Sequence, residues 1–152
     1  SERRKYIPMG YLTQSEIIND SAMAVYKADL FLFGVLSASI HTIWVRAIGG
    51  RIKTDFRYSA ALCYNTFPIP EATSQQKKEI TTAALEIVSC RENYSDLSLA
   101  EMYDPDDQPE DLKVCHEKLD AKVEALYQSG SFKSDEDKLA ALFKWHKKMI
   151  GA

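Results

Sequence analysis

The sequence has little cysteine and no stretch long enough to span a membrane, and we expect no signal peptide, because no apolar core follows the first residues. Its three cysteines are scattered without CxxC spacing, which indicates reduced thiols rather than a disulfide framework. The apolar run at residues 30–45 carries no Asp, Glu, Lys or Arg, but it is 16 residues long and a membrane span needs about 20. A buried core helix is the better interpretation of this run. We expect a cytoplasmic protein without a membrane partner.

Candidates for catalysis or metal binding are equally scarce. His41, His116 and His146 lie far apart and outside patterns such as HExxH, so a hydrogen-bonded core histidine is the simpler interpretation of His41. Gly49 and Gly50 form an isolated pair that indicates the end of a helix rather than a phosphate-binding loop. We expect no catalytic residue, no metal and no cofactor within this chain. Because it does not begin with Met, we also expect it to be part of a longer protein.

Charge divides the chain at a double-proline break. The formal net charge of -3 combines a first half of +3, residues 1–70, with a second half of -6, residues 71–152. The segment FPIPE at residues 67–71 can neither continue a helix nor sit in a central strand, because each proline lacks an N–H donor. We place a domain boundary there. The acidic total argues against general nucleic-acid affinity, whereas the basic first half leaves room for a local anion-binding surface.

The two parts differ in their patterns of apolar residues. The first part combines one long helix, expected at residues 28–48, with strand-like runs at residues 17–18, 23–26, 51–56 and 59–64. The second part shows three helices, which begin after Thr73 or Ser74, near Glu110 and after Ser134. Asp107 with Glu110 resembles a capping box for the middle helix. The predicted fold class is α+β, with a mixed helix–strand part followed by a small three-helix part.

An alternating set of charges stands out just before the break. Arg51, Lys53, Asp55 and Arg57 are two residues apart, so a single strand would place all four on one face. Pattern alone favours a solvated strand face. The alternative is contact with a DNA groove, where Lys donates to guanine O6 and N7 and Asp accepts from cytosine N4. An acidic residue among basic residues is unfavourable near phosphate. This makes Asp55 more informative than the basic residues around it.

Four short motifs around this segment occur in a fixed order. They are H-x-x-W-x-R at His41, Trp44 and Arg46; G-R at residues 50–51; R-Y-S at residues 57–59; and Y-N-x-F-P-x-P at residues 64–70. The tail segments LAEMYDP and DEDKLAALF follow them, and the resemblance that these motifs carry covers nearly the whole chain. In this combination the sequence resembles the C-terminal part of the MmeI-like type IIL restriction–modification proteins and related adenine-specific DNA methyltransferases.

The resemblance implies a division of labour within a longer enzyme. Residues 1–70 would be the end of a DNA target-recognition domain, and residues 71–152 a helical C-terminal domain. Neither the S-adenosylmethionine-binding motif nor the NPPY-type adenine-methylation motif occurs in this sequence. The chain itself would therefore neither methylate nor cut. Its partners would be double-stranded DNA and an upstream methyltransferase domain, which uses S-adenosylmethionine and, if the enzyme also cleaves DNA, Mg²⁺.

The resemblance also implies which residues contact bases. The family's base-contacting positions fall on Lys53, Asp55 and Arg57, and a second, less securely aligned segment falls on Asp20 and Ser21. We expect Lys53 and Asp55 to read one G·C pair in the major groove and Arg57 to read a neighbouring base.

The DNA backbone would be held by two further basic residues. We expect Arg46 and Arg51 to contact phosphates, which fix the register of a protein on the duplex. The alternative for the whole chain is a non-enzymatic helical protein-interaction module, in which the acidic second half binds a protein and the charged strand is only solvated surface. Duplex affinity that weakens steeply with salt would separate the two.

Overall fold

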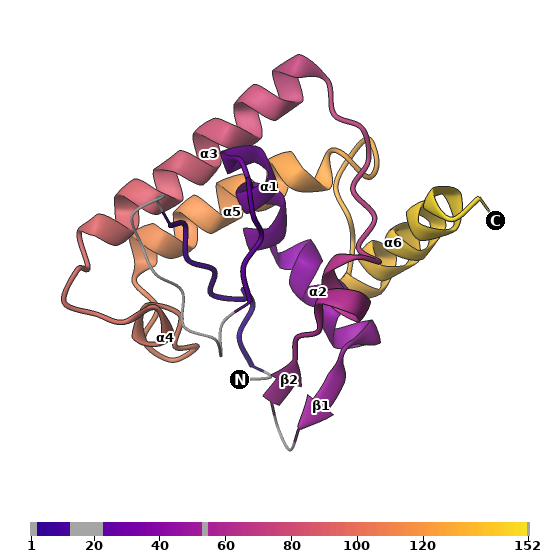
Figure 1. Ribbon diagram of the computed structural model, residues 1–152. Coiled ribbons are helices and arrows are strands. Elements are labelled where there is room, and N and C mark those ends of the chain that lie inside the picture. The colour runs from indigo at the N-terminus through magenta and orange to yellow at the C-terminus, as the bar shows by residue number, and fades with distance from the viewer. Residues whose placement is uncertain (1–2, 13–22, 53–54, 152) are drawn as a thin grey trace.

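The chain folds into a mainly helical structure with one small β-hairpin (Figure 1). This structure, a computed structural model, describes residues 3–12, 23–52 and 55–151, with the backbone alone for residues 50–52 and 55–57. The elements in chain order are α1 Leu30–Ser37, α2 Ser39–Ile48, β1 Gly50–Ile52, β2 Asp55–Arg57, the π-helical turn η1 Ala60–Tyr64, α3 Ser74–Glu92, α4 Leu99–Met102, α5 Glu110–Glu124 and α6 Asp135–Met149.

The predicted α+β class is wrong, because strand is confined to that hairpin within the described part of the chain. Residues 23–26 form no strand, and residues 59–64 hold the π-helical turn η1 instead. The segment 17–18 lies outside the described residues. Short apolar runs gave the wrong class because their periodicity does not separate a strand from a short piece of buried helix.

The apolar run at residues 30–45 is buried as predicted, but it forms two helices rather than one. Ala38 adopts an extended backbone between them, and α1 and α2 meet at 61°. Asp29 caps α1 by accepting a hydrogen bond from Leu32 N at 2.8 Å. No single described helix is long and apolar enough to cross a membrane. Among the described residues, only the bent α1–α2 pair taken together has a sufficient length and apolar composition.

The core lies where α1 and α2 meet the helices of the second half. Helices α3 and α5 lie side by side, α1 crosses them, and α6 packs against α2 (Figure 1). Val35 of α1, Trp44 of α2, Ile80 of α3 and Leu119 of α5 are all essentially inaccessible to solvent. Burial of side chains of this size contributes about 1.5–3 kcal/mol each. The boundary at residue 70 stays a prediction about domains, but helices from both sides of it share this core.

Local capping patterns in the second half were partly predicted. Thr73 accepts from Gln76 N at 3.2 Å at the start of α3, and Ser134 accepts from Asp137 N at 3.2 Å at the start of α6, as expected. The capping box at Asp107 is wrong, because α5 begins after Pro109 without a side-chain cap. The short helix α4, which has a capping box of its own, was not predicted.

Candidate nucleic-acid interface

The β-hairpin extends from the end of α2, away from α3 and α5 (Figure 1). Its strands are antiparallel, and the register pairs Gly50 with Arg57, Arg51 with Phe56, and Ile52 with Asp55. Consecutive positions of a strand alternate between the two faces of a sheet, whereas directly paired positions share one. Positions 55 and 57 therefore belong to one face and position 51 to the other. The expectation of one continuous strand with four charges on a single face is wrong, because the chain reverses between residues 52 and 55.

The predicted DNA-contacting residues fall partly outside the described structure. Lys53, Asp20 and Ser21 lie outside the described residues, and for Asp55 the structure gives the backbone position in β2 alone, as it does for Arg57. Arg51 likewise has a described backbone position in β1. The structure thus brings positions 51, 55 and 57 into one hairpin, and their contacts with DNA stay predictions.

Arg46 near the C-terminal end of α2 is described in full. Its Nη2 donates a hydrogen bond to the carbonyl oxygen of Arg4 at 2.7 Å, and the side chain is partly buried. This bond ties the N-terminal segment to α2. Its predicted contact with a DNA phosphate stays a prediction, since one edge of the guanidinium is already engaged inside the protein.

The remaining motif residues of α2 hold the chain that follows the hairpin. His41 Nε2 and the Tyr58 hydroxyl are 3.0 Å apart and hydrogen-bonded, and Trp44 Nε1 donates to Thr66 Oγ1 at 3.2 Å. Residues 41 and 44 lie one turn apart, so they present the same face of the helix. The H-x-x-W motif is therefore a support for the hairpin and its exit segment, a role that sequence reasoning did not assign.

The polar pair behind the hairpin is uncharged. Burial lowers the pKa of His41 to about 3 and raises the pKa of Tyr58 well above its ordinary value. At neutral pH the imidazole is neutral and the phenol keeps its proton. Their hydrogen bond is thus one between neutral groups in a low-dielectric environment, where leaving either group unpaired costs about 1–3 kcal/mol.

Helix α6 and the turn after α5 also hold this exit segment. Tyr127 donates its hydroxyl proton to Pro68 O at 2.8 Å, and His146 Nδ1 of α6 donates to Thr66 O at 2.9 Å. Trp145 Nε1 in turn donates to Tyr127 O at 3.0 Å. These partners are about 60 to 80 residues from the segment they hold, so no local sequence signal could have identified them.

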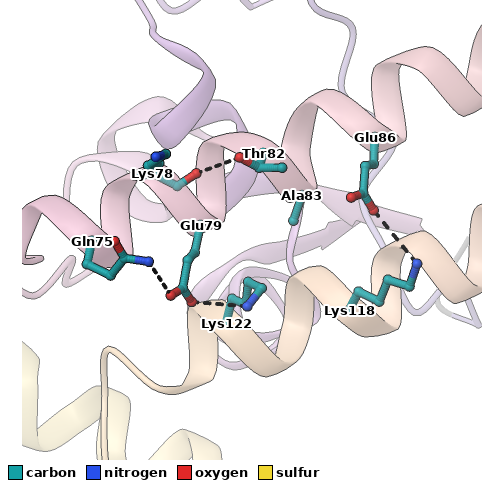
Figure 2. A pocket seen from close by; sticks show the side chains of 8 residues that line it. All are labelled: Gln75, Lys78, Glu79, Thr82, Ala83, Glu86, Lys118 and Lys122. Atoms are coloured by element: carbon teal, nitrogen blue, oxygen red, sulfur yellow. Dashed lines mark hydrogen bonds and ion pairs between the residues drawn. The ribbon is translucent and has the colours of Figure 1, made fainter.

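A surface groove between α3 and α5 is the other candidate for a binding site. Figure 2 shows two ion pairs across the groove: Lys122 Nζ lies 3.0 Å from Glu79 Oε2, and Lys118 Nζ lies 3.9 Å from Glu86 Oε2. Opposite charges that pair in this way leave no field of one sign for a nucleic acid. The groove is better explained as the ion-paired seam of two packed helices.

Buried polar clusters elsewhere in the described residues are structural. His116 Nε2 and the Tyr103 hydroxyl are joined at 2.6 Å, Arg91 Nε donates to that hydroxyl at 3.0 Å, and Tyr6 stacks on the imidazole at 4.1 Å between ring centroids. Burial, reinforced by the charge of Arg91, lowers the pKa of His116 to about 3. Within the described ranges no group of three His, Cys, Asp or Glu residues could hold a metal ion.

Comparison with known proteins covers the chain from end to end. Residues 1–71 match the family "MmeI, target recognition domain", and residues 72–151 match "MmeI, C-terminal domain". The chain is 48% identical over 149 residues to "DNA methyltransferase A" of Bacillus subtilis (strain 168), which covers 98% of this chain and 17% of that protein. A solved structure of the type IIL restriction–modification enzyme MmeI in complex with DNA matches all of the chain with a TM-score of 0.93 and 37% identity, over 20% of its own length. The chain thus spans about a fifth of the length of these relatives.

Proposed function

Because the chain belongs to the MmeI family, with its target recognition domain followed by its C-terminal domain, we propose that it recognises a specific sequence in double-stranded DNA as part of a longer DNA methyltransferase. One observation carries the proposal: the whole chain shares its fold, at a TM-score of 0.93 and 37% identity, with part of a restriction–modification enzyme solved in complex with DNA. Identity at that level, over the full chain, supports a shared role as well as a shared fold.

The chemistry of the whole enzyme follows from its relatives. The longer protein would transfer a methyl group from S-adenosylmethionine to adenine at the recognised site, in the cytoplasm, where bacterial DNA lies. DNA cleavage with Mg²⁺ would be a further activity of the same protein. Since neither methyltransferase motif occurs in these 152 residues, both activities would depend on other parts of it, and this chain would decide where they act.

The hairpin is the proposed base-contacting element. A two-stranded ribbon fits the major groove of B-form DNA. Lys53 donates to the O6 and N7 of a guanine, Asp55 accepts from the N4 amine of the paired cytosine, and Arg57 contacts a neighbouring base. Positions 55 and 57 share one face of the hairpin through the register, which supports a joint role.

Two further sets of residues would complete the interface. Asp20 and Ser21 would contribute a second base contact. Arg51, whose position belongs to the other face of the hairpin, would contact a phosphate, and so would Arg46, which also bonds the carbonyl oxygen of Arg4. Phosphate contacts of this kind set register and orientation without carrying sequence information.

Exchanging the two central charges tests this function. In the longer protein, Lys53→Asp with Asp55→Lys keeps the net charge and reverses the order of donor and acceptor. We expect the preferred base pair to invert at one position of the methylated site, because a base contact of this type contributes about 1–3 kcal/mol of discrimination. Sequencing of methylated adenines in a host that lacks its own adenine methylation measures the preference.

The matched control exchanges an ion pair far from the hairpin. Glu79→Lys with Lys122→Glu inverts the pair at the α3–α5 groove (Figure 2) and should leave the methylated sequence unchanged. If the Lys53–Asp55 exchange protein still methylates and prefers the same base at every position, the base-contact assignment is wrong. If it methylates nothing, its binding to duplexes that carry each of the four base pairs at that position decides the assignment.

The alternative of a helical protein-interaction module has no support from a specific feature of the fold. Residues 1–71 match a target recognition domain, and Lys118 and Lys122 of α5 form ion pairs with Glu86 and Glu79 of α3 across the groove between the two helices.

A further inference from the structure

The hairpin is too small to fix its own position. Each strand has three residues, and the ladder has three pairs. An isolated two-stranded hairpin is marginally stable at best in water. Base contacts, in contrast, need side chains held within about 0.5 Å of the productive geometry. A hairpin that discriminates between bases must therefore be fixed by the structure behind it.

One end of the hairpin is fixed by the chain itself. Strand β1 begins two residues after α2 ends, and Gly49 N donates to Val45 O at 2.8 Å, which continues the helical hydrogen bonding up to the hairpin. Helix α2 is anchored by Ile40, Trp44 and Val45, which are at most 1% exposed. The position of the start of β1 is thus fixed by the buried helix α2.

The other end is tied to the same helix by a side-chain hydrogen bond. Tyr58 directly follows Arg57, the last residue of β2, and its hydroxyl lies 3.0 Å from His41 Nε2. The imidazole is fully buried, and Phe67 packs against it with the ring centroids 4.5 Å apart. Because His41 cannot move without disturbing the core, the hydroxyl of Tyr58 has a rigid partner.

We propose that His41 and Tyr58 form a positioning pair that fixes where β2 presents Asp55 and Arg57 to DNA, so that their hydrogen bond contributes to sequence discrimination rather than to overall DNA affinity. This inference rests on the proposed function. In this proposal neither His41 nor Tyr58 contacts DNA. Both act through β2, which Tyr58 directly follows.

The chain that follows Tyr58 is also restrained, so it cannot shift far to compensate for loss of the Tyr58–His41 hydrogen bond. Ser59 N donates to the sulfur of the buried Cys63 at 3.5 Å, and Cys63 N donates to Ser59 O at 2.7 Å. The π-helical turn η1, with Ser59 as its N-cap, begins at Ala60 and packs on α2. If the tyrosine bond is lost, this turn still holds residue 59, and we expect the position of β2 to become less fixed.

Removal of one hydroxyl tests the pair. In the longer protein, Tyr58→Phe keeps the ring and deletes the bond to His41. The readout is the ratio of methylation rates on the preferred site and on sites with one changed base pair at the positions that β2 contacts. We expect this ratio to fall about tenfold, within the range that one base contact provides. Affinity for the preferred site and its salt dependence should stay within about threefold, because phosphate contacts dominate both.

A matched variant separates positioning from stability. Tyr6→Phe also deletes a buried tyrosine hydroxyl, the one that donates to Asp120 Oδ2 at 3.0 Å, far from the hairpin in the sequence and at the other end of α2. Both variants should lower the melting temperature by a similar amount, and Tyr58→Phe alone should lose discrimination. Equal loss of discrimination in the two variants would show that general destabilisation is responsible, and would overturn the positioning role.

Variants of the partner residue keep the test decisive if Tyr58→Phe does not fold. His41→Gln retains a polar group near the position of Nε2 and should keep most of the discrimination, whereas in His41→Leu the discrimination should fall about tenfold.

Asp55→Ala distinguishes a failure of the positioning role from a failure of the base contact on which it rests. If Asp55→Ala loses discrimination and the Tyr58 and His41 variants keep it, the positioning role is wrong and the proposed function stands. If Asp55→Ala also keeps it, the assignment of base contacts to the hairpin is wrong and this inference fails with it.

Discussion

At the scale of single residues, one buried carboxylate organises the junction between the two halves of the chain. Asp120 of α5 accepts from Ser39 N at 2.8 Å through Oδ1 and from the Tyr6 hydroxyl at 3.0 Å through Oδ2. Helix α2 begins at Ser39 without a side-chain cap of its own, so Asp120 supplies that cap from a distant helix. Its negative charge also suits the positive end of the α2 dipole.

Replacing this carboxylate should be strongly destabilising. Asp120→Ala leaves Ser39 N and the Tyr6 hydroxyl without their partner in a site that is 7% exposed. We expect the free energy of unfolding to fall by about 2–4 kcal/mol, because each unsatisfied buried polar group costs about 1–3 kcal/mol. Glu117→Ala, an exposed position of the same helix, should change it by less than about 0.5 kcal/mol. Urea unfolding of the 152-residue chain measures both, and equal small losses would contradict the capping role.

Sequence predicted single residues well only where their partners are close along the chain. Thr73 and Ser134 cap helices through backbone groups three residues away, and the pattern that places them is local. Asp120 and Ser39 are 81 residues apart. Nothing in the α5 sequence distinguishes this aspartate from its exposed neighbours, because its role exists only once α2 has packed against it.

At the scale of elements, a close crossing of α1 and α3 depends on the absence of a side chain. A Cβ added at Gly34 would lie 2.9 Å from Ile80 Cγ2 and 3.1 Å from the Cβ of Ala84. Residues 80 and 84 are one turn apart on α3, so they border one groove in which the backbone of α1 rests. This crossing sets the position of α1 and, through the bend at Ala38, contributes to the direction of α2.

A methyl group at this crossing should separate the helices. Alanine is favoured over glycine in a helix by up to about 1 kcal/mol, but overpacking typically costs about 1–3 kcal/mol. We expect Gly34→Ala to lower the free energy of unfolding, with partial recovery when Ala84→Gly is added. Gly10→Ala is the control, since its nearest neighbour would be 3.8 Å away. Thermal and denaturant unfolding of the four proteins measure the effect, and a stabilised Gly34→Ala variant would contradict the close packing.

The candidate interface shows why the boundaries of β1 and β2 could not be predicted from the sequence. Alternation over residues 51–57 predicted one strand, yet the chain reverses between residues 52 and 55. The two intervening residues, Lys53 and Thr54, include none of the Gly, Asn or Pro residues that commonly indicate a tight turn. The charge pattern predicted a strand where the structure has a hairpin, and the pairing of Arg51 with Phe56 follows from the register, which alternation alone does not encode.

At the scale of the whole molecule, the target recognition and C-terminal regions stabilise each other. The residues matched by the two families meet at residues 71 and 72, and the core crosses that line, with Val35 and Trp44 on one side and Ile80 and Leu119 on the other. The helices of the C-terminal region therefore support the β-hairpin through α2. Composition shifted at the same place, but composition does not report which surfaces pack together.

Two buried histidines make the stability of this shared core depend on pH. Burial holds His41 and His116 neutral in the folded chain, with pKa values of about 3 against an ordinary value of 6.5. A group whose folded pKa is depressed contributes stability above its unfolded pKa, and that contribution is lost as the pH falls, because the unfolded chain then binds more protons. The loss begins near pH 6.5 and continues towards pH 3. Between pH 7 and pH 5 it amounts to about 4 kcal/mol for the two histidines together.

Removing one titrating imidazole should halve this dependence. We expect His116→Gln to be less stable than the original chain at pH 7, because Gln cannot reproduce the stacking of the imidazole on Tyr6. Its further loss between pH 7 and pH 5 should be only about 2 kcal/mol. Urea unfolding at the two pH values measures both differences. Asp120, whose pKa is raised by burial, titrates in both proteins and largely cancels from the comparison. An unchanged loss of stability in the variant would mean that His116 can take up a proton in the folded chain, and that the contacts around Tyr103 and Arg91 do not keep it neutral.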